Sequence, residues 1–344
     1  MIEKSVMSVI MNLSIRSIYY VKKNIIQQAG NSNNKGGVLE KAQLNMESLA
    51  IILDNVIRSC STNKLSQKMN YFFVMGQAVA KEGNQVKSGF DLVLENDFNK
   101  LNIDSLAKDI IKSATEQLGG EACSSGDYPT VLANNVVADL VGAYVSSADA
   151  EEVQKHTSLF AGKLGQKIAS SRLTIEDRPM AKTLFSRYFD DEGVATYNKA
   201  IIKNGVLQTY LYNLTTAAKE GRQSTGNAAS SGAKMGIAPT YLFVKPGKKS
   251  LEEIFKEIGN GVYITDVQGL HSGLDPQTGN FSLQANGFLI KDGKKDHGLD
   301  VITVSGNLIK LFNDVTCVGS NQKTFPSSIS CPSVLVKKLA IGGK

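Results

Sequence analysis

Histidine is the first residue type to examine for chemistry, because neutral imidazole binds zinc and acts as a general base near neutral pH. The chain contains three histidines, His156, His271 and His297. No two of them stand at the spacing of a helical metal pair. In the folded chain, His271 and Asp275 could meet at a metal ion. His297, with Asp296 and Asp300 beside it, is a second possible set, although loops of this composition are usually turns.

Other local signatures of catalysis are missing from the sequence. No GxSxG elbow surrounds a serine, no GxxxxGK[ST] loop is present, and no GxGxxG follows a predicted strand to begin a helix. The four cysteines are Cys60, Cys123, Cys317 and Cys331. They are far apart and form no CxxC pair, so the sequence lacks a local zinc knuckle and favours a reducing compartment.

A run of small residues at 224–232 (STGNAASSG) cannot form a hydrophobic core. Its backbone N–H groups could bind a carboxylate, a phosphate or a peptide strand. The candidate peptide-contact residues in this run are Ser224, Thr225, Gly226 and Asn227. A flexible surface loop without a ligand is the alternative interpretation.

Length and composition narrow the class of protein. A chain of 344 residues with 42% hydrophobic residues should fold into about two domains. The net charge is +6, but the basic residues are scattered, so nucleic acid is not an expected partner. The apolar run near the N-terminus is interrupted by Arg16 and Lys22, which argues against a membrane span, and no cleavage site follows it. We therefore expect a cytoplasmic protein that does not interact with a membrane.

The elements expected around these residues change in character along the chain. A hairpin is predicted at Gly83, a helix capped by Asp104 follows it, and two more helices with apolar stripes cover 136–144 and 153–168. After residue 179, strands and turns predominate, with short helices starting at 214, 251 and 307. We predict an N-terminal segment and linker at 1–40, an α/β domain at 41–178 and a β-rich domain at 179–344.

Eight short blocks, in order, resemble consecutive blocks of the TldD/PmbA family. They are LTIEDRP at 173–179, FDDEGV at 189–194, IKNGVL at 202–207, STGN at 224–227, IGNGVYIT at 258–265, ANGFLI at 285–290, VSGNL at 304–308 and LAIGG at 339–343. The resemblance covers about half of the chain and fades towards the N-terminus. It implies an α+β fold, with a shortened, helix-containing N-terminal α/β part followed by a large, mostly antiparallel β domain.

The resemblance also implies which of two kinds of subunit this chain is similar to. TldD is a zinc metalloprotease with an HExxxH helix and a distant cysteine ligand, whereas TldE, or PmbA, lacks them. Placed over that motif, ADLVGA at 138–143 has Ala138 and Ala143 at the imidazole positions and Asp139 at the glutamate position. A methyl group cannot bind zinc, so no cofactor is expected in this chain and zinc is expected in a TldD-like partner.

The function implied is that of a non-catalytic subunit which, with a TldD-like metalloprotease chain, processes small peptides. The resemblance also leaves room for a homodimer when that partner is missing. Two alternatives remain. One is a stand-alone metal-dependent peptidase built from His271, Asp275 and His297, and the other is a regulator that binds DNA gyrase, as an older name of the family suggests.

Overall fold

The computed structural model describes residues 51–52, 55–59, 64–83, 85–231 and 234–343. These residues divide into two compact units. Unit 1 contains the described part of Met1–Val56 together with Lys68–Gly120, and unit 2 contains Ile57–Gln67 and Glu121–Lys344. The segment and linker predicted at 1–40 lie outside the described residues. The boundary predicted at 178–179 falls inside unit 2.

Unit 1 is built on a long antiparallel hairpin of β4 (Tyr71–Glu82) and β5 (Gln85–Glu95), with β1 (Ile51–Ile52) paired to β4. The hairpin turns at the predicted position, where Gly83 has a φ of +57°. Alternate residues of β4 are buried, as expected for a strand with one covered face. That face packs against α2, and η1 (Phe98–Lys100) connects the two.

Helix α2 (Ile103–Thr115) confirms the predicted amphipathic helix but begins earlier than expected. Its N-cap is Asn102, whose side chain accepts a hydrogen bond from the N–H of Ser105 at 2.9 Å, so Asp104 lies in the first turn. Gly89 of β5 lets the helix approach closely, because a Cβ at this position would stand 2.3 Å from the backbone nitrogen of Ala114.

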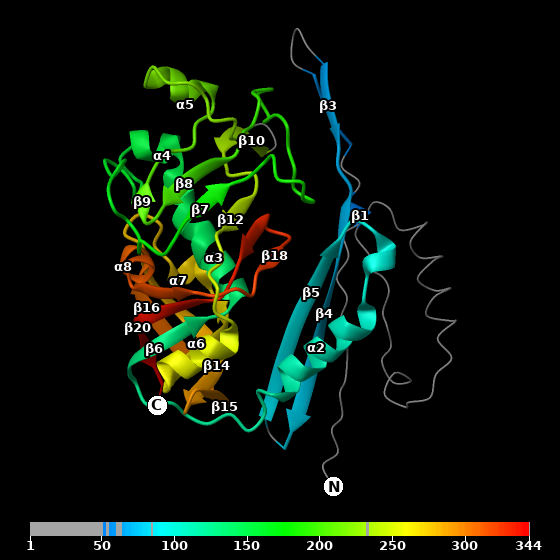
Figure 1. Ribbon diagram of the computed structural model, residues 1–344, viewed down its shortest axis with the longest axis vertical. Helices are drawn as coiled ribbons and strands as arrows, with labels where there is room; N and C mark the ends of the chain where they lie inside the picture. Colours follow the sequence, from blue (N-terminus) through cyan, green and yellow to red (C-terminus); the bar gives the residue numbers. More distant parts are fainter. Residues whose placement is uncertain (1–50, 53–54, 60–63, 84, 232–233, 344) are drawn as a thin grey trace. The chain divides into compact units, whose positions relative to one another are not determined.

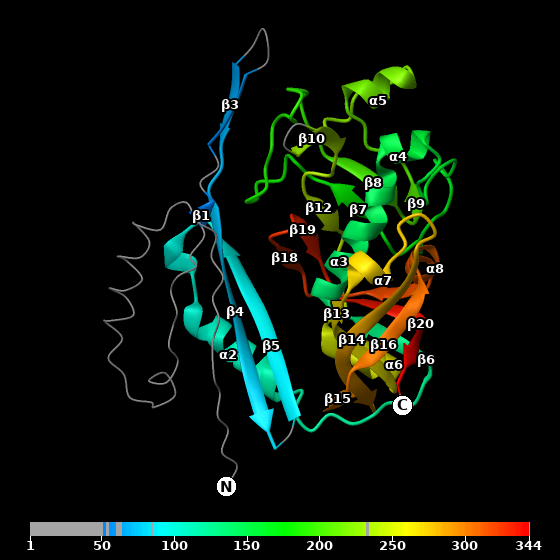
Figure 2. The same cartoon turned by 180° about the vertical axis from the view of Figure 1, so that it is seen from behind.

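Unit 2 contains two larger sheets (Figures 1 and 2). The six-stranded sheet consists of β18 (Lys323–Phe325), β19 (Ile329–Cys331), β12 (Leu242–Val244), β7 (Ile175–Asp177), β8 (Lys199–Lys203) and β9 (Val206–Leu207). The seven-stranded sheet consists of β13 (Gly261–Gln268), β6 (Gly126–Leu132), β20 (Val334–Gly342), β16 (Ile302–Asn307), β14 (Asn280–Lys291), β15 (Lys294–Gly298) and β17 (Val315–Val318). Two separate pairs are β10 (Ala228–Ser231) with β11 (Lys234–Ile237), and β2 (Asn55–Ser59) with β3 (Lys64–Lys68).

The strand pairings of the seven-stranded sheet form a closed circuit. β13 pairs with both β6 and β14, and β16 and β20 connect β14 back to β6. Only the β6–β13 and β12–β19 pairs are parallel among the strand pairs described. The fold is therefore α+β with mostly antiparallel sheets, as the sequence predicts.

Side-chain caps mark the starts of only some of the helices of unit 2. The helices are α3 (Asn134–Val145), η2 (Ser146–Ala148), α4 (Ala150–Gln154), α5 (Leu214–Lys219), α6 (Leu251–Ile258), α7 (Leu270–Gly273) and α8 (Leu308–Asn313). Capping boxes hold the first turns of α5 and α6, and Asn307 caps α8. Within the described ranges, no helix has the length and apolar character required to cross a membrane.

The helix predicted at 153–168 is wrong beyond its first residues. Helix α4 ends at Gln154, and turns follow it. His156 has a φ of +59°, and Gly162 and Gly165 have values of +70° and +76°. Left-handed residues interrupt a right-handed helix, so Phe160 and Ile168 are buried from turns instead, and Leu164 is exposed.

Helix α3 explains why the predicted boundary at residue 178 fails. It packs against β13 of one sheet and against β18 and β19 of the other, and Figure 1 shows it between the two. Both sheets contribute to one core with the helix, so residues 121–178 cannot belong to a different domain from the strands that follow.

Candidate functional site

Helix α3 carries the three positions at which the sequence predicts lost metal ligands. The predicted inward stripe of this helix is confirmed, since Val136, Val137, Leu140, Val141 and Tyr144 are all buried. Ala138 is also buried, Ala143 is partly buried and Asp139 is exposed. Of these three side chains, only that of Asp139 carries oxygen atoms that could bind a metal ion.

Asp139 lies in an acidic surrounding. Although part of the residue reaches solvent, the carboxyl group itself is partly buried, and this burial, followed by the negative charge of Asp266, raises the pKa of Asp139 to about 6. The Asp266 carboxylate on β13 accepts hydrogen bonds from Gln268 Nε2 at 3.1 Å and from Asn286 Nδ2 at 3.5 Å. Asp139 therefore keeps its proton to a higher pH than an ordinary aspartate does.

Cys331 is the sulfur nearest to this helix, and it is held as a thiol. It is fully buried at the end of β19, and its Sγ donates to the backbone oxygen of Asn134 at 3.0 Å. Burial, followed by the charge of Asp139, raises the pKa of the Cys331 thiol well above its usual range. A metal ligand or a nucleophile must be a thiolate, so the protonated Cys331 thiol is suited to neither role.

The raised pKa of Asp139 predicts a pH-dependent stability. A folded-state pKa near 6, above the ordinary 3.8, means that the folded state binds the proton more tightly. The contribution of Asp139 to stability is then greatest below pH 4 and falls as the pH rises towards 6. We expect Asp139→Asn to stabilise the protein at about pH 7.5 by ~1 kcal/mol, discounted for its exposure, and to change little near pH 4.

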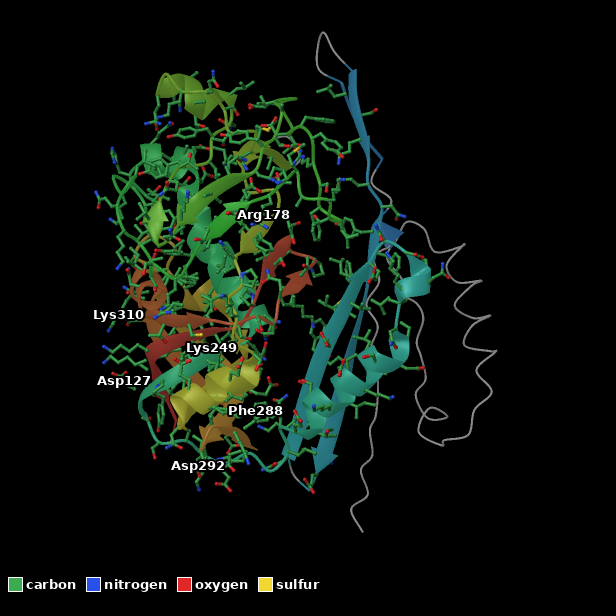
Figure 3. The ribbon with its side chains drawn as sticks, viewed as in Figure 1. Asp127, Arg178, Lys249, Phe288, Asp292 and Lys310 are labelled. Carbon is green, nitrogen blue, oxygen red and sulfur yellow. The ribbon has the colours of Figure 1, made fainter. Side chains whose placement is uncertain are left out.

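Urea denaturation at both pH values measures this effect. Asp127→Asn is the matched control, because this exposed carboxylate pairs with Lys338 Nζ at 2.7 Å, and the pair lowers the pKa of Asp127 (Figure 3). The control should show no stabilisation at the higher pH. Equal effects of the two substitutions would show that Asp139 is not under electrostatic strain.

The alternative site of His271, Asp275 and His297 is not assembled. His271 lies on α7 and Asp275 in the turn before β14, where its carboxylate accepts bonds from Gln277 and Thr278. His297 lies on β15, which pairs with the other end of β14. Eight residues of strand, from Asn280 to Phe288, separate the two places by about 26 Å.

His297 instead contacts two carboxylates, with Nδ1 2.9 Å from Asp296 and Nε2 3.8 Å from Glu121. Within the described part of the chain, no three His, Cys, Asp or Glu side chains form a group that could hold a metal ion. The alanines of α3 offer no ligand atoms either, so the residues present do not fit a catalytic zinc ion.

The candidate peptide-contact residues are mostly interior. Thr225, Gly226 and Asn227 are buried, and Ser224 is half-buried. Thr225 exchanges hydrogen bonds with the backbone of Tyr212, and a Cβ at Gly226 would stand 2.8 Å from the oxygen of Ala195. This placement does not favour direct contact of these side chains with a peptide.

Asn227 instead belongs to a buried polar network. Lys199 Nζ lies 3.2 Å from Asp177 Oδ2 and donates to Asn227 Oδ1 at 3.1 Å, while Asn227 Nδ2 donates to Asp177 Oδ2 at 2.7 Å. The backbone N–H groups of Thr240 and Tyr241 donate to Asp177 Oδ1. Burial lowers the pKa of Lys199, and the adjacent Asp177 opposes that shift.

This network connects segments that the sequence shows only as separate blocks. Asp177 comes from the block at 173–179 and Asn227 from the block at 224–227. Asp190, from the block at 189–194, accepts the N–H of Ala228 at 2.9 Å and is buried. Arg178 lies beside β7 and β12, with its guanidinium 3.7 Å from the centre of the Phe243 ring (Figure 3). Sequence reasoning missed Lys199, for which the ordinary strand KAIIK gives no signal.

A central helix packed between two mostly antiparallel sheets defines an α+β protein. Residues 125–343 match the family profile described as the PmbA/TldA metallopeptidase C-terminal domain. The chain belongs to the PmbA/TldD family, and its similar proteins include both PmbA and TldE.

Several known proteins show the extent of the likeness. The Metalloprotease PmbA homolog of Buchnera aphidicola is 28% identical over 96% of this chain and 69% of its own length, and Metalloprotease PmbA of Escherichia coli O157:H7 is 32% identical over 69% of this chain. A crystal structure from Thermotoga maritima, assigned as a modulator of a DNA gyrase, has a TM-score of 0.77 and 37% identity. TldE from Thermococcus kodakarensis has a TM-score of 0.76 and 26% identity.

The match covers only part of the length of these relatives. The chain spans 50% of the E. coli protein and 64% of each of these two structures, while both structures cover 81% of this chain.

Proposed function

We propose that the protein is a non-catalytic subunit of a PmbA/TldD-type metalloprotease complex. The observation that carries the proposal is helix α3, where Ala138 and Ala143 supply methyl groups at the positions of the predicted ligands. The one remaining polar position, Asp139, faces a second carboxylate, and the nearest thiol is held protonated. A chain with this donor set would shape a chamber, while a TldD-like partner would supply the zinc ion and the hydrolytic chemistry.

The substrates proposed are small or unfolded peptides. Extended peptides are bound through main-chain hydrogen bonds at exposed strand edges, which tolerates many sequences. We propose a cytoplasmic location, in keeping with the described cysteines, which are all free. A homodimer in the absence of the partner is proposed as well, and direct binding of nucleic acid is not expected because the basic residues are scattered.

Co-expression with an HExxxH-bearing chain of the same family tests the function. Each chain alone and the two together would be assayed for zinc content by mass spectrometry and for cleavage of an unstructured peptide. We expect zinc and activity in the partner-containing complex and neither in this chain alone. Stoichiometric zinc and peptide cleavage by the isolated chain would overturn the proposal and favour the stand-alone peptidase.

A further inference from the structure

The side-chain amide of Gln67 is bonded like a peptide group. Its Nε2 donates to the backbone oxygen of Ser186, and its Oε1 accepts the N–H of Tyr188 at 2.8 Å. Because one amide reaches both groups, this C=O and the N–H two residues later point to the same side of the chain. A neighbouring strand satisfies the same pair with its own peptide groups.

Other backbone groups of this segment are bonded within unit 2. The N–H of Arg187 donates to the oxygen of Pro179 at 2.8 Å, and the oxygen of Tyr188 accepts the N–H of Thr196 at 3.0 Å. The Arg187 side chain forms an ion pair with Asp191. These bonds fix the segment, so its Ser186 oxygen and Tyr188 N–H are presented in a set geometry.

Three large apolar side chains border the segment and are exposed. Tyr188 is 58% exposed, Tyr197 47% and Met180 43%. Two of them contact Thr196, whose N–H donates to the oxygen of Tyr188 and whose Oγ1 lies 3.7 Å from the sulfur of Met180, and Tyr197 follows Thr196 in the chain. Tyrosine and methionine are enriched at binding surfaces, because they offer large contact areas without demanding one partner sequence.

We propose that residues 186–188 form a docking edge for an extended peptide, and that Gln67 is an internal occupant which the peptide displaces. This inference rests on the peptide-processing function proposed above and places peptide binding at these residues. The edge presents one acceptor and one donor to a main chain, and its exposed flank is aromatic and sulfur-containing. This chemistry fits a peptide backbone with mixed side chains better than it fits a charged ligand.

Fluorescence anisotropy with a labelled, unstructured peptide tests this on the isolated full chain. Gln67→Ala removes the competing amide and its two neutral hydrogen bonds, so we expect the peptide to bind about three- to ten-fold more tightly. Gln67→Glu keeps the size and the acceptor but repels the Ser186 oxygen, and should also tighten binding. Gln208→Ala is the matched control, because Gln208 is exposed and its side-chain amide donates to the nearby oxygen of Val206.

A second peptide, methylated on alternate backbone nitrogens, should lose binding, since it lacks the required N–H groups. Unchanged or weaker binding to both Gln67 variants, with melting curves like the wild type, would overturn the docking edge. Equal binding of the methylated peptide would also overturn it, as would an effect of Gln67→Ala on self-association alone in sedimentation. No zinc-bearing partner is present in these assays, so their failure leaves the complex test unaffected, and the reverse also holds.

Discussion

Replacing Lys199 with methionine is expected to destabilise the protein by about 3 to 5 kcal/mol, because the substitution leaves a buried carboxylate without its counter-charge. The side chains of Lys199 and Asp177 are 5% and 0% exposed, so water cannot replace the lost ammonium group. Three donors remain on Asp177, from Asn227, Thr240 and Tyr241. They orient the carboxylate but do not neutralise it.

The free energy of unfolding from urea denaturation measures the effect. Lys203→Met is the matched control, since Lys203 lies on the same strand, β8, with its side chain exposed, and we expect its loss to stay within ~0.5 kcal/mol. Adding Asp177→Asn to Lys199→Met removes the stranded charge and should recover part of the stability. If the double substitution costs the sum of the two single ones, the ion pair is not the cause.

The local elements of this fold could be predicted because their signals act over a few residues. The turn at Asn204 and Gly205 has φ values of +48° and +80°, which that pair of residues adopts readily, and Asp292–Gly293 behaves in the same way. The capping boxes of α5 and α6 likewise depend on side chains three residues apart. In each case the sequence contains the whole interaction.

Long-range features could not be predicted in this way. Lys199 contacts Asp177, which is 22 residues away in the sequence, and Asn227, which is 28 residues away. The local sequence pattern predicts neither contact. The domain boundary was missed for a related reason. The change from helices to strands after residue 179 is a change of composition, whereas membership of a core is decided by what α3 touches on both sides.

The features of the candidate site also divide into those that depend on residue identity alone and those that depend on the fold. The loss of metal ligands proposed for α3 follows from the resemblance, because it depends only on residue identity. The acidic pairing of Asp139 with Asp266, 127 residues later, required the fold. The 224–227 run was misjudged because small polar residues satisfy buried backbone groups as well as they form loops.

Tyr144 holds α3 in the core, and we expect Tyr144→Ala to cost about 3 to 5 kcal/mol. Its ring is completely buried, stacked 4.5 Å from Phe312 and edge-on to Phe160 at 4.8 Å between ring centres. The hydroxyl donates to the oxygen of Ile168. Alanine would leave a cavity between these aromatic rings and remove that hydrogen bond.

Tyr144→Phe separates the two contributions, because it keeps the ring and removes only the hydroxyl. Its cost should be ~1 kcal/mol, since Asn313 Nδ2 still donates to the Ile168 oxygen at 3.1 Å. Urea denaturation of both variants measures the difference. A Tyr144→Ala variant as stable as Tyr144→Phe would mean that the ring does not anchor α3. Since Asp139 lies on the same helix, a loosened α3 should also abolish the stabilisation expected for Asp139→Asn near pH 7.5, which connects the packing of the helix to the electrostatics of its exposed face.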